Sequence, residues 1–336
     1  MSEITIVIPN YNGIKYLEDC LNSIMMQTDD APEFEVLIVD NGSTDGSREL
    51  LVKLEQETAL SGRVNKGRNL IRNILLEENT GFCHAVNVGI EASQSPYVLL
   101  LNNDTKIKTG FIKNLYNAIQ TNDRIFSVSS KMLMWDKPEL LDDAGDYYNA
   151  LGWAFARGKG KLAAKYNQRA NIFSACGGAS IYRKAVFEEI GLFDEAHFAY
   201  LEDLDIGYRA RIAGYRNIYE PGAEVLHYGS ASTGSRYNEW KTERAAANSI
   251  YVISKNMPIL QILLNLPLLF AGFLIKWLFF CKKKMGKLYL KGLKNGFVRC
   301  FSAEGREKKV RFRCENFKNY VIIQIELWIN LIRRFA

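Results

Sequence analysis

The first third of the chain alternates short β-branched apolar runs with segments of helical period, and this alternation constrains the fold more than any other feature. The apolar runs lie at residues 4–8, 36–39, 73–76 and 97–101, and the helical segments at residues 16–26, 45–57 and 85–92. Strands separated by helices are typical of βαβ units, in which helices cover a mostly parallel sheet. We therefore predict an α/β domain that binds its ligands at the carboxyl ends of its strands.

The length of the chain favours one large domain with an appendage. It has 336 residues, of which 48% are hydrophobic, so it can bury a full core. The pattern changes beyond residue 256, because residues 259–280 are almost wholly apolar and residues 320–332 form a second apolar stretch. We predict a main domain over residues 1–256 and a helical extension over residues 257–336.

The extension is basic although the chain as a whole is only slightly so. The net charge is +6, and residues 282–336 contain 15 Lys and Arg against four Glu, so the preceding part is acidic. A basic tail indicates an anionic partner, either a membrane surface or a nucleic acid. Its charges are interleaved with apolar runs and match no known nucleic-acid module, so we favour a membrane and expect no nucleic acid.

Residues 259–280 have close to the roughly 20 residues needed to span a bilayer. Four residues interrupt this segment: Gln261, Asn265, Pro267 and Lys276. A span would carry buried polar groups and would place the following basic residues on the far side from the main domain. We therefore expect a broken or in-plane hairpin at the inner membrane surface, with residues 282–294 on anionic headgroups. The alternative is a helical pair packed on the main domain or on another subunit.

The cysteines and the N-terminus favour a reducing compartment. The six cysteines show no Cys-x-x-Cys spacing and no nearby His-x-x-x-His, so neither a zinc site nor a disulfide framework is indicated. Residues 1–9 lack the basic stretch and long apolar core of a signal peptide. We expect the main domain to lie in the cytoplasm.

A first polar cluster follows the predicted strand at residues 36–39. Asp40 is followed by Gly42, Ser43 and further turn-forming residues. A carboxylate at a strand end can accept a hydrogen bond from a base N–H, while small residues let the backbone approach a ribose. The same residues suit a capped strand-to-helix turn, so the pattern alone leaves both interpretations open.

A second cluster follows the predicted strand at residues 97–101. It consists of Asn102, Asn103 and Asp104. A carboxylate there can hold a hard divalent cation whose coordination is completed by substrate phosphates. As a bare pattern, these three residues are more often a turn.

A third cluster combines acids with a histidine. Its members are Asp194, Glu195, Glu202, Asp203, Asp205 and His227. Acids at a helix start can simply complement the helix dipole. The adjacent pair Glu202 and Asp203 is less easily explained in this way, because neighbouring carboxylates raise each other's pKa and one can then act as a general base. His227 follows a predicted strand at residues 223–226, and a lone histidine is more often structural than a ligand.

Taken together, the clusters resemble family-two glycosyltransferases with the GT-A fold, and most closely the rhamnosyltransferase-like members that build bacterial surface polysaccharides. The resemblance runs in order from about residue 3 to residue 256. It is carried by residues 7–12, 39–47, 79–82, Asn87, Gly89, 101–105, 177–179, 191–195, 202–205, Arg209, Gly214, Tyr215, Pro221 and His227. It implies a mostly parallel central sheet flanked by helices.

The resemblance also implies a role for each matched residue. Asp104 and His227 would bind a divalent metal, Mg²⁺ or Mn²⁺, that bridges the donor diphosphate. Asp203 would be the general base, and Glu202 would lie in the acceptor site. The donor nucleotide would be bound by Pro9, Asn12, Asp40, Gly42, Ser43, Asn79, Gly81, Phe82, Asn87, Asn102 and Asn103. The family's Asp-x-Asp motif begins here with an asparagine, which leaves the metal affinity open.

The function that the resemblance implies is inverting transfer of a sugar from a nucleoside-diphosphate donor to a glycan or lipid-linked glycan. Rhamnose is the first candidate, and the enzyme would work at the cytoplasmic face of the cell membrane, with a homo-oligomer left open. The alternatives are another nucleotide-sugar-dependent hexosyltransferase, another nucleotide-dependent enzyme, or a non-enzymatic protein that binds anionic polymers. A dehydrogenase is disfavoured because residues 9–13 contain no Gly-x-Gly-x-x-Gly.

Overall fold

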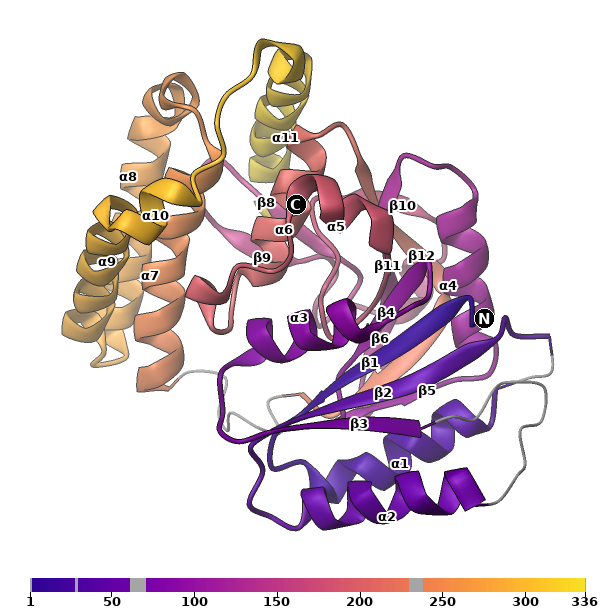
Figure 1. Cartoon of the computed structure of the whole chain (residues 1–336). Helices are drawn as coiled ribbons and strands as arrows, with labels where there is room; N and C mark the ends of the chain where they lie inside the picture. The colour runs from indigo at the N-terminus through magenta and orange to yellow at the C-terminus, as the bar shows by residue number, and fades with distance from the viewer. Residues whose placement is uncertain (1, 28–29, 61–70, 230–237, 336) are drawn as a thin grey trace.

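The computed structural model describes residues 2–27, 30–60, 71–229 and 238–335. Within these residues a ten-stranded sheet forms the centre of the molecule, with helices on both faces (Figure 1). Its main strand order is β10-β12-β6-β11-β4-β1-β2-β3, and β5 and β7 pair with β12 and β6. The α/β architecture predicted from the sequence is confirmed.

The N-terminal part of the sheet is parallel, as the alternation of strands and helices predicts. Its elements are β1 (Ile4–Asn10), α1 (Ile14–Met25), β2 (Phe34–Asn41), α2 (Ser47–Leu60), β3 (Ile71–Leu76), α3 (Phe82–Ala92) and β4 (Tyr97–Leu101). Alternate residues of β1 face opposite layers: Ile6 packs in the core cluster with Leu17 of α1, and Val7 in the cluster with Val86 of α3. This two-sided burial explains why the strands are almost wholly apolar.

The sheet is mixed beyond β4. The following elements are β5 (Thr105–Ile107), α4 (Phe111–Gln120), β6 (Ile125–Met134), β7 (Lys137–Asp143), β8 (Asp146–Tyr148), β9 (Ala154–Ala156), η1 (Ala163–Lys165), β10 (Ala170–Ile172), β11 (Ala179–Arg183), α5 (Lys184–Ile190), η2 (Glu195–His197), α6 (Glu202–Ile212) and β12 (Arg216–His227). Strand β11 runs antiparallel between β4 and β6. Strand β12 pairs with β5 so that His227 lies opposite Thr105, next to the end of β4.

The rest of the chain is helical. Its elements are α7 (Glu239–Asn256), α8 (Ile259–Lys282), α9 (Gly286–Phe301), α10 (Ala303–Glu307), η3 (Cys314–Asn316) and α11 (Phe317–Phe335). Helices α7, α8 and α9 lie side by side at one end of the molecule (Figure 1). Helix α9 approaches α7 closely, since a Cβ on Gly292 would lie 2.4 Å from the carbonyl oxygen of Glu243 and one on Gly296 would lie 2.3 Å from that of Ala247.

The expected break within residues 259–280 is wrong, because α8 continues through Pro267. A proline removes one intrahelical hydrogen bond, and here the turns before and after it remain helical and packed. The chain reverses after α8 instead, where Phe280 stacks on Tyr289 of α9 with ring centroids 5.0 Å apart. Among the described residues, α8 is the one helix long and apolar enough to cross a membrane.

The polar residues of α8 face the protein. Asn265 and Gln324 of α11 exchange two side-chain hydrogen bonds of 2.8 and 2.9 Å, and Tyr208 of α6 donates its hydroxyl to Gln261 at 3.0 Å. One side of α8 is therefore fixed to α6 and α11 and buries Leu269, while apolar residues on the other side, such as Leu260 and Phe270, are exposed. The helical extension thus packs on the main domain, as the alternative interpretation of this segment expects.

Candidate active site

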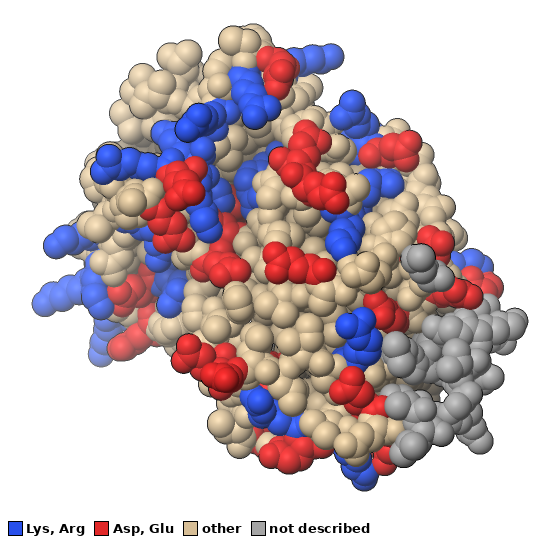
Figure 2. Space-filling view, viewed as in Figure 1, with Lys and Arg blue, Asp and Glu red and all other residues tan. Residues whose placement is uncertain are grey.

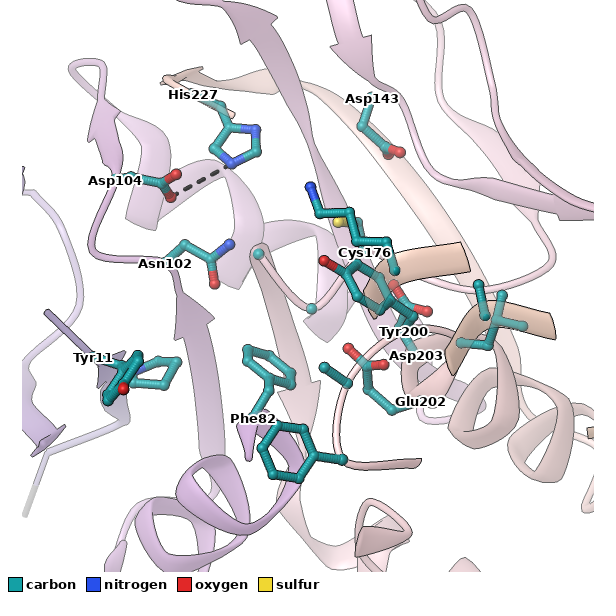
Figure 3. A pocket seen from close by; sticks show the side chains of 18 of the residues that line it. Tyr11, Phe82, Asn102, Asp104, Asp143, Cys176, Tyr200, Glu202, Asp203 and His227 are labelled. Atoms are coloured by element: carbon teal, nitrogen blue, oxygen red, sulfur yellow. Dashed lines mark ion pairs between the residues drawn. The ribbon is translucent and has the colours of Figure 1, made fainter. Parts of the chain in front are cut away.

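A cavity of about 1130 Å³ lies at the carboxyl ends of β1, β2 and β4. Its lining residues that the sequence singled out are Pro9, Asn79, Phe82, Asn102, Asn103, Asp104, Glu202, Asp203 and His227. Asp104 and His227 lie on one side of this cavity, and Glu202 and Asp203 on the other (Figure 3). The fold therefore brings together residues from the N-terminal, central and C-terminal parts of the main domain.

On the first side, His227 lies between two carboxylates. Its Nε2 is 3.4 Å from Oδ1 of Asp104, and its Nδ1 is 2.7 Å from Oδ2 of Asp142, which also pairs with Lys159. Burial alone would lower the pKa of His227, but its contacts with Asp104 and Asp142 raise it to about 9. Burial opposes the ionised form of Asp142, yet the hydrogen bond with His227 and the charge of Lys159 hold its pKa below the usual range.

This arrangement fits a divalent cation. A metal-ligating histidine commonly donates its other ring N–H to a carboxylate, which fixes the orientation of the ring. Asp142 occupies that position toward His227, and Asp104 supplies the oxygen ligand that hard cations prefer. A bound cation would replace the proton on Nε2 of His227, because a metal-ligating imidazole must be neutral.

Asp40 lies behind the cavity wall. It is fully buried and accepts hydrogen bonds from Nδ2 of Asn10 at 2.8 Å and from the backbone N–H of Ser43 at 3.0 Å. Asn10 in turn accepts a hydrogen bond of 2.6 Å from Asn103. Asp40 is thus linked by a hydrogen bond to Asn10, which lines the cavity. Direct contact between Asp40 and a nucleotide base stays a prediction.

Five further residues that were predicted to bind the donor nucleotide do not line the cavity. The residues of this group are Asn12, Gly42, Ser43, Gly81 and Asn87. Gly42 has φ of 76°, and a Cβ there would lie 2.7 Å from the backbone of Glu78, so only glycine fits. Asn87 fastens α3 to the segment before η2 through its hydrogen bonds with the backbone of Phe193.

Asn41 lines the cavity, although sequence analysis placed it in a matched motif without giving it a role. Its side chain donates to Oδ1 of Asn79 and to the carbonyl of Gly81, both at 3.1 Å, and accepts from the backbone N–H of Thr80 at 3.0 Å. It thereby joins the ends of β2 and β3. Its position directly after Asp40 at a strand end was the signal that could have found it.

On the second side, Glu202 and Asp203 begin α6. Burial and then the neighbouring Asp203 charge raise the pKa of Glu202 to about 8, and burial raises the pKa of Asp203 as well. The backbone N–H of Leu204 donates to Oδ1 of Asp203 at 2.7 Å and fixes this carboxyl group. Burial is the main cause of both shifts, and a role of either acid as general base stays a prediction.

Two further acids of the cavity, Asp143 and Asp146, escaped sequence analysis. Burial and the Asp142 charge raise the pKa of Asp143 to about 7, although a hydrogen bond from the backbone of Gly145 opposes the shift. Burial and the Asp143 charge raise the pKa of Asp146 well above its usual value. Asp143 ends β7 and Asp146 begins β8, two strands that the sequence analysis did not predict.

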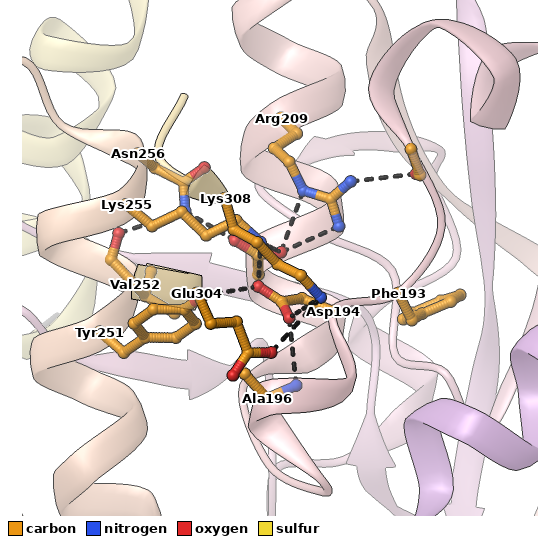
Figure 4. A network of polar contacts seen from close by, with 12 residues as sticks. Phe193, Asp194, Ala196, Arg209, Tyr251, Val252, Lys255, Asn256, Glu304 and Lys308 are labelled. Carbon is orange, nitrogen blue, oxygen red and sulfur yellow. Dashed lines mark hydrogen bonds and ion pairs between the residues drawn. The ribbon is translucent and has the colours of Figure 1, made fainter. Parts of the chain in front are cut away.

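Behind the acid pair lies a buried network of charges (Figure 4). Asp194, His197 and Asp205 offer atoms within 4.8 Å of one another, a set that resembles a metal site in composition. However, Nζ of Lys255 lies 2.6 Å from Asp194 and 2.8 Å from Asp205, and Arg209 also pairs with Asp205. These side-chain cations already neutralise the carboxylates, so Asp104 and His227 are the better metal candidates.

The strand order, and a cavity at the carboxyl ends of β1, β2 and β4 with acids on both sides of it, agree with the GT-A fold that the sequence resembles. Residues 5–191 match the family described as Glycosyl transferase family 2. The chain belongs to this family, and the family membership expected from its motifs is confirmed.

Similar proteins agree with this assignment. Glycosyltransferase GlyG of Streptococcus pneumoniae is 27% identical over 200 residues, which cover 59% of this chain and 61% of that protein. An N-acetylglucosaminyl-diphospho-decaprenol L-rhamnosyltransferase of Mycobacterium tuberculosis is 27% identical over 256 residues, or 69% of this chain and 78% of that protein. The mannosyltransferase PcManGT from Pyrobaculum calidifontis, solved with GDP-Man and Mn²⁺, matches with a TM-score of 0.52 and 14% identity, covering 96% of this chain and 87% of that one. This structural likeness confirms the fold.

Proposed function

We propose that this protein transfers a sugar from a nucleoside-diphosphate donor to a hydroxyl group of a glycan or lipid-linked glycan in the synthesis of a surface polysaccharide. The observation that carries the proposal is the division of the cavity. The pair Asp104 and His227, braced by Asp142, lies on one side, and the acid pair Glu202 and Asp203 lies on the other. Such a division suits a reaction in which a negatively charged diphosphate leaves from one side of the sugar. On the other side, a base removes the proton of the acceptor hydroxyl.

Asp104 and His227 would hold Mg²⁺ or Mn²⁺ at the diphosphate of the donor. When bound, the cation stabilises the negative charge that the leaving diphosphate acquires. Asp142 would keep Nε2 of His227 directed at the site by holding Nδ1. The nucleotide would lie along Pro9, Asn41, Asn79 and Phe82, at the ends of β1 and β2.

Asp203 would accept the proton of the acceptor hydroxyl. Its raised pKa makes it a stronger base than an exposed aspartate, and the backbone N–H of Leu204 holds it in place. Burial and the Asp203 charge raise the pKa of Glu202, and in its protonated form it would donate a hydrogen bond to the acceptor. A single base on the side opposite the leaving group corresponds to one displacement, hence inversion.

The identity of the transferred sugar is proposed only from similarity to other proteins. The relative from Mycobacterium tuberculosis is named for L-rhamnose transfer, which keeps rhamnose as the first candidate, and the mannosyltransferase neighbour was solved with GDP-Man. A panel of dTDP-, UDP- and GDP-sugars, each with Mg²⁺ or Mn²⁺, tests the proposal through thermal shift and slow donor hydrolysis. A donor that stabilises the protein only with metal supports it, and no response to any donor would contradict it.

We also propose that the helical extension binds the inner surface of the membrane. Leu260 and Phe270 of α8 are 76% and 70% exposed, and Ile332 and Phe335 of α11 are 72% and 74% exposed. Lysine and arginine side chains gather over α9 and α10, on the same end of the molecule (Figure 2). Exposed apolar helices bordered by cations suit a surface of anionic lipids, into which they would insert in plane.

A further inference from the structure

The loop that leads into the acid pair is strained. Phe198 has φ of 61° and ψ of −57°, and the N–H of Ala199 donates to the carbonyl of His197 at 2.7 Å, which is a rare form of γ-turn. Tyr200 and Leu201 follow with φ of 71° and 67°. Left-handed conformations of non-glycine residues are unfavourable and persist only where the surroundings impose them.

One side chain imposes much of this conformation. Asn248 of α7 is fully buried, and its Nδ2 lies within hydrogen-bond distance of the carbonyl oxygens of His197, Ala199 and Tyr200, at 3.1, 3.0 and 2.8 Å. Asn248 thus holds the backbone immediately before the acid pair.

Asn248 is itself oriented from the helical extension. Nη1 of Arg299, on α9, donates to Oδ1 of Asn248 at 2.9 Å. This contact fixes the amide so that its nitrogen faces the loop. The contact is possible because Gly292 and Gly296 let α9 pack directly against the backbone of α7.

We propose that Asn248 is a positioning residue, which holds the loop at residues 197–201 and thereby the carboxyl group of Asp203 at the cavity, and that Arg299 orients its amide. The inference rests on the proposed function, because it takes Asp203 as the base. It means that the extension contributes to the chemistry as well as to membrane binding. Catalysis depends steeply on geometry, since a displacement of about 1 Å can cost about 10²-fold in rate.

The test uses the full-length protein with its best donor and metal. Asn248→Ala is expected to lower kcat by about 10- to 100-fold while the Kd for the donor changes by less than about twofold, because Asn248 itself bonds to none of the predicted donor-binding residues. Arg299→Ala is expected to lower kcat less, and Arg299→Lys to recover most of the loss. The matched control is Asn295→Ala, which removes a 2.9 Å hydrogen bond between α9 and Glu243 of α7 without touching the loop, and it should behave as wild type.

Several outcomes would overturn the inference. Wild-type kcat in Asn248→Ala, an equal loss in Asn295→Ala, or a loss of donor affinity as large as the loss of kcat would each show that Asn248 does not act through Asp203. If Asn248→Ala fails to fold, Arg299→Ala and Arg299→Lys decide, since Arg299 is partly exposed. An Asp203→Asn variant separates the two proposals: if it is inactive while Asn248→Ala is fully active, only the positioning role is wrong. If Asp203→Asn turns over like wild type, the proposed function is wrong and the positioning role falls with it.

Discussion

Replacing Lys255 by Met should destabilise the fold, and the structure sets the size of the effect. Lys255 is 4% exposed, and its Nζ lies between the carboxylates of Asp194 and Asp205. Removing one partner of a buried ion pair costs about 3–5 kcal/mol, because an uncompensated charge stays buried. In the variant, the carboxylate of Asp194 would still have Tyr251 and Lys308 as hydrogen-bond partners. The carboxylate of Asp205 would still pair with Arg209 and accept a hydrogen bond from Asn256. We therefore expect the lower end of that range, about 3 kcal/mol.

Urea unfolding followed by circular dichroism measures this loss of free energy. The control is Lys53→Met, because Lys53 and Glu57 form an exposed pair at 3.8 Å that should contribute less than about 1 kcal/mol. A loss below about 1 kcal/mol in Lys255→Met would refute the reasoning. It would mean that the remaining partners of the two carboxylates suffice.

The same change should alter the response to acid. Despite burial, Lys255 contributes to a depressed pKa of Asp194, and Arg209 and Lys255 to that of Asp205. A carboxyl group with a depressed pKa in the folded state gives stability that is present above its unfolded pKa of about 3.9 and lost as the pH falls through the folded value. Without Lys255 both folded pKa values rise, so acid unfolding should begin at a higher pH than in wild type.

Three further predictions concern activity and localisation. Asp203→Asn should lower kcat by about 10²–10⁴-fold with donor binding nearly unchanged, and wild-type turnover in steady-state assays would remove Asp203 as the base. Asp104→Ala and His227→Ala should each weaken metal-dependent donor binding, whereas an unchanged Mn²⁺ titration at fixed donor in both would exclude them from the site. The full-length protein should float with vesicles of anionic lipid in low salt, and Phe270→Glu should reduce this binding, while the exposed substitution Val52→Glu on α2 should not.

The sheet could be predicted from the sequence because its signal is local. Each of the four parallel strands is a short apolar run, and the intervening helices follow within a few residues, so neighbouring residues carry the information. The mixed part beyond β4 could not be derived in this way. Strand β11 inserts between β4 and β6, and that pairing joins segments far apart in the chain.

The site was predicted in part, for a related reason. The roles of Asp104 and His227 came from a family resemblance, and their contact depends on the pairing of β5 with β12, which no local pattern encodes. The partners Asp142 and Asn248 carry no motif at all. Their importance arises from what they touch, and a single carboxylate or amide in a sequence does not show its partner.

The contacts across residue 256 bear on how the chain is organised. The predicted boundary separates a catalytic part from a membrane-binding part, yet Arg299 and Lys308, both beyond it, bond to Asn248 and Asp194 within the main domain. Both contacts end at the loop and the charge network that support the acid pair. Arg299 lies on α9, one of the helices that carry the exposed basic surface of the extension. In the described residues the extension is therefore packed and hydrogen-bonded to the main domain, and the boundary at residue 256 does not separate two independent parts.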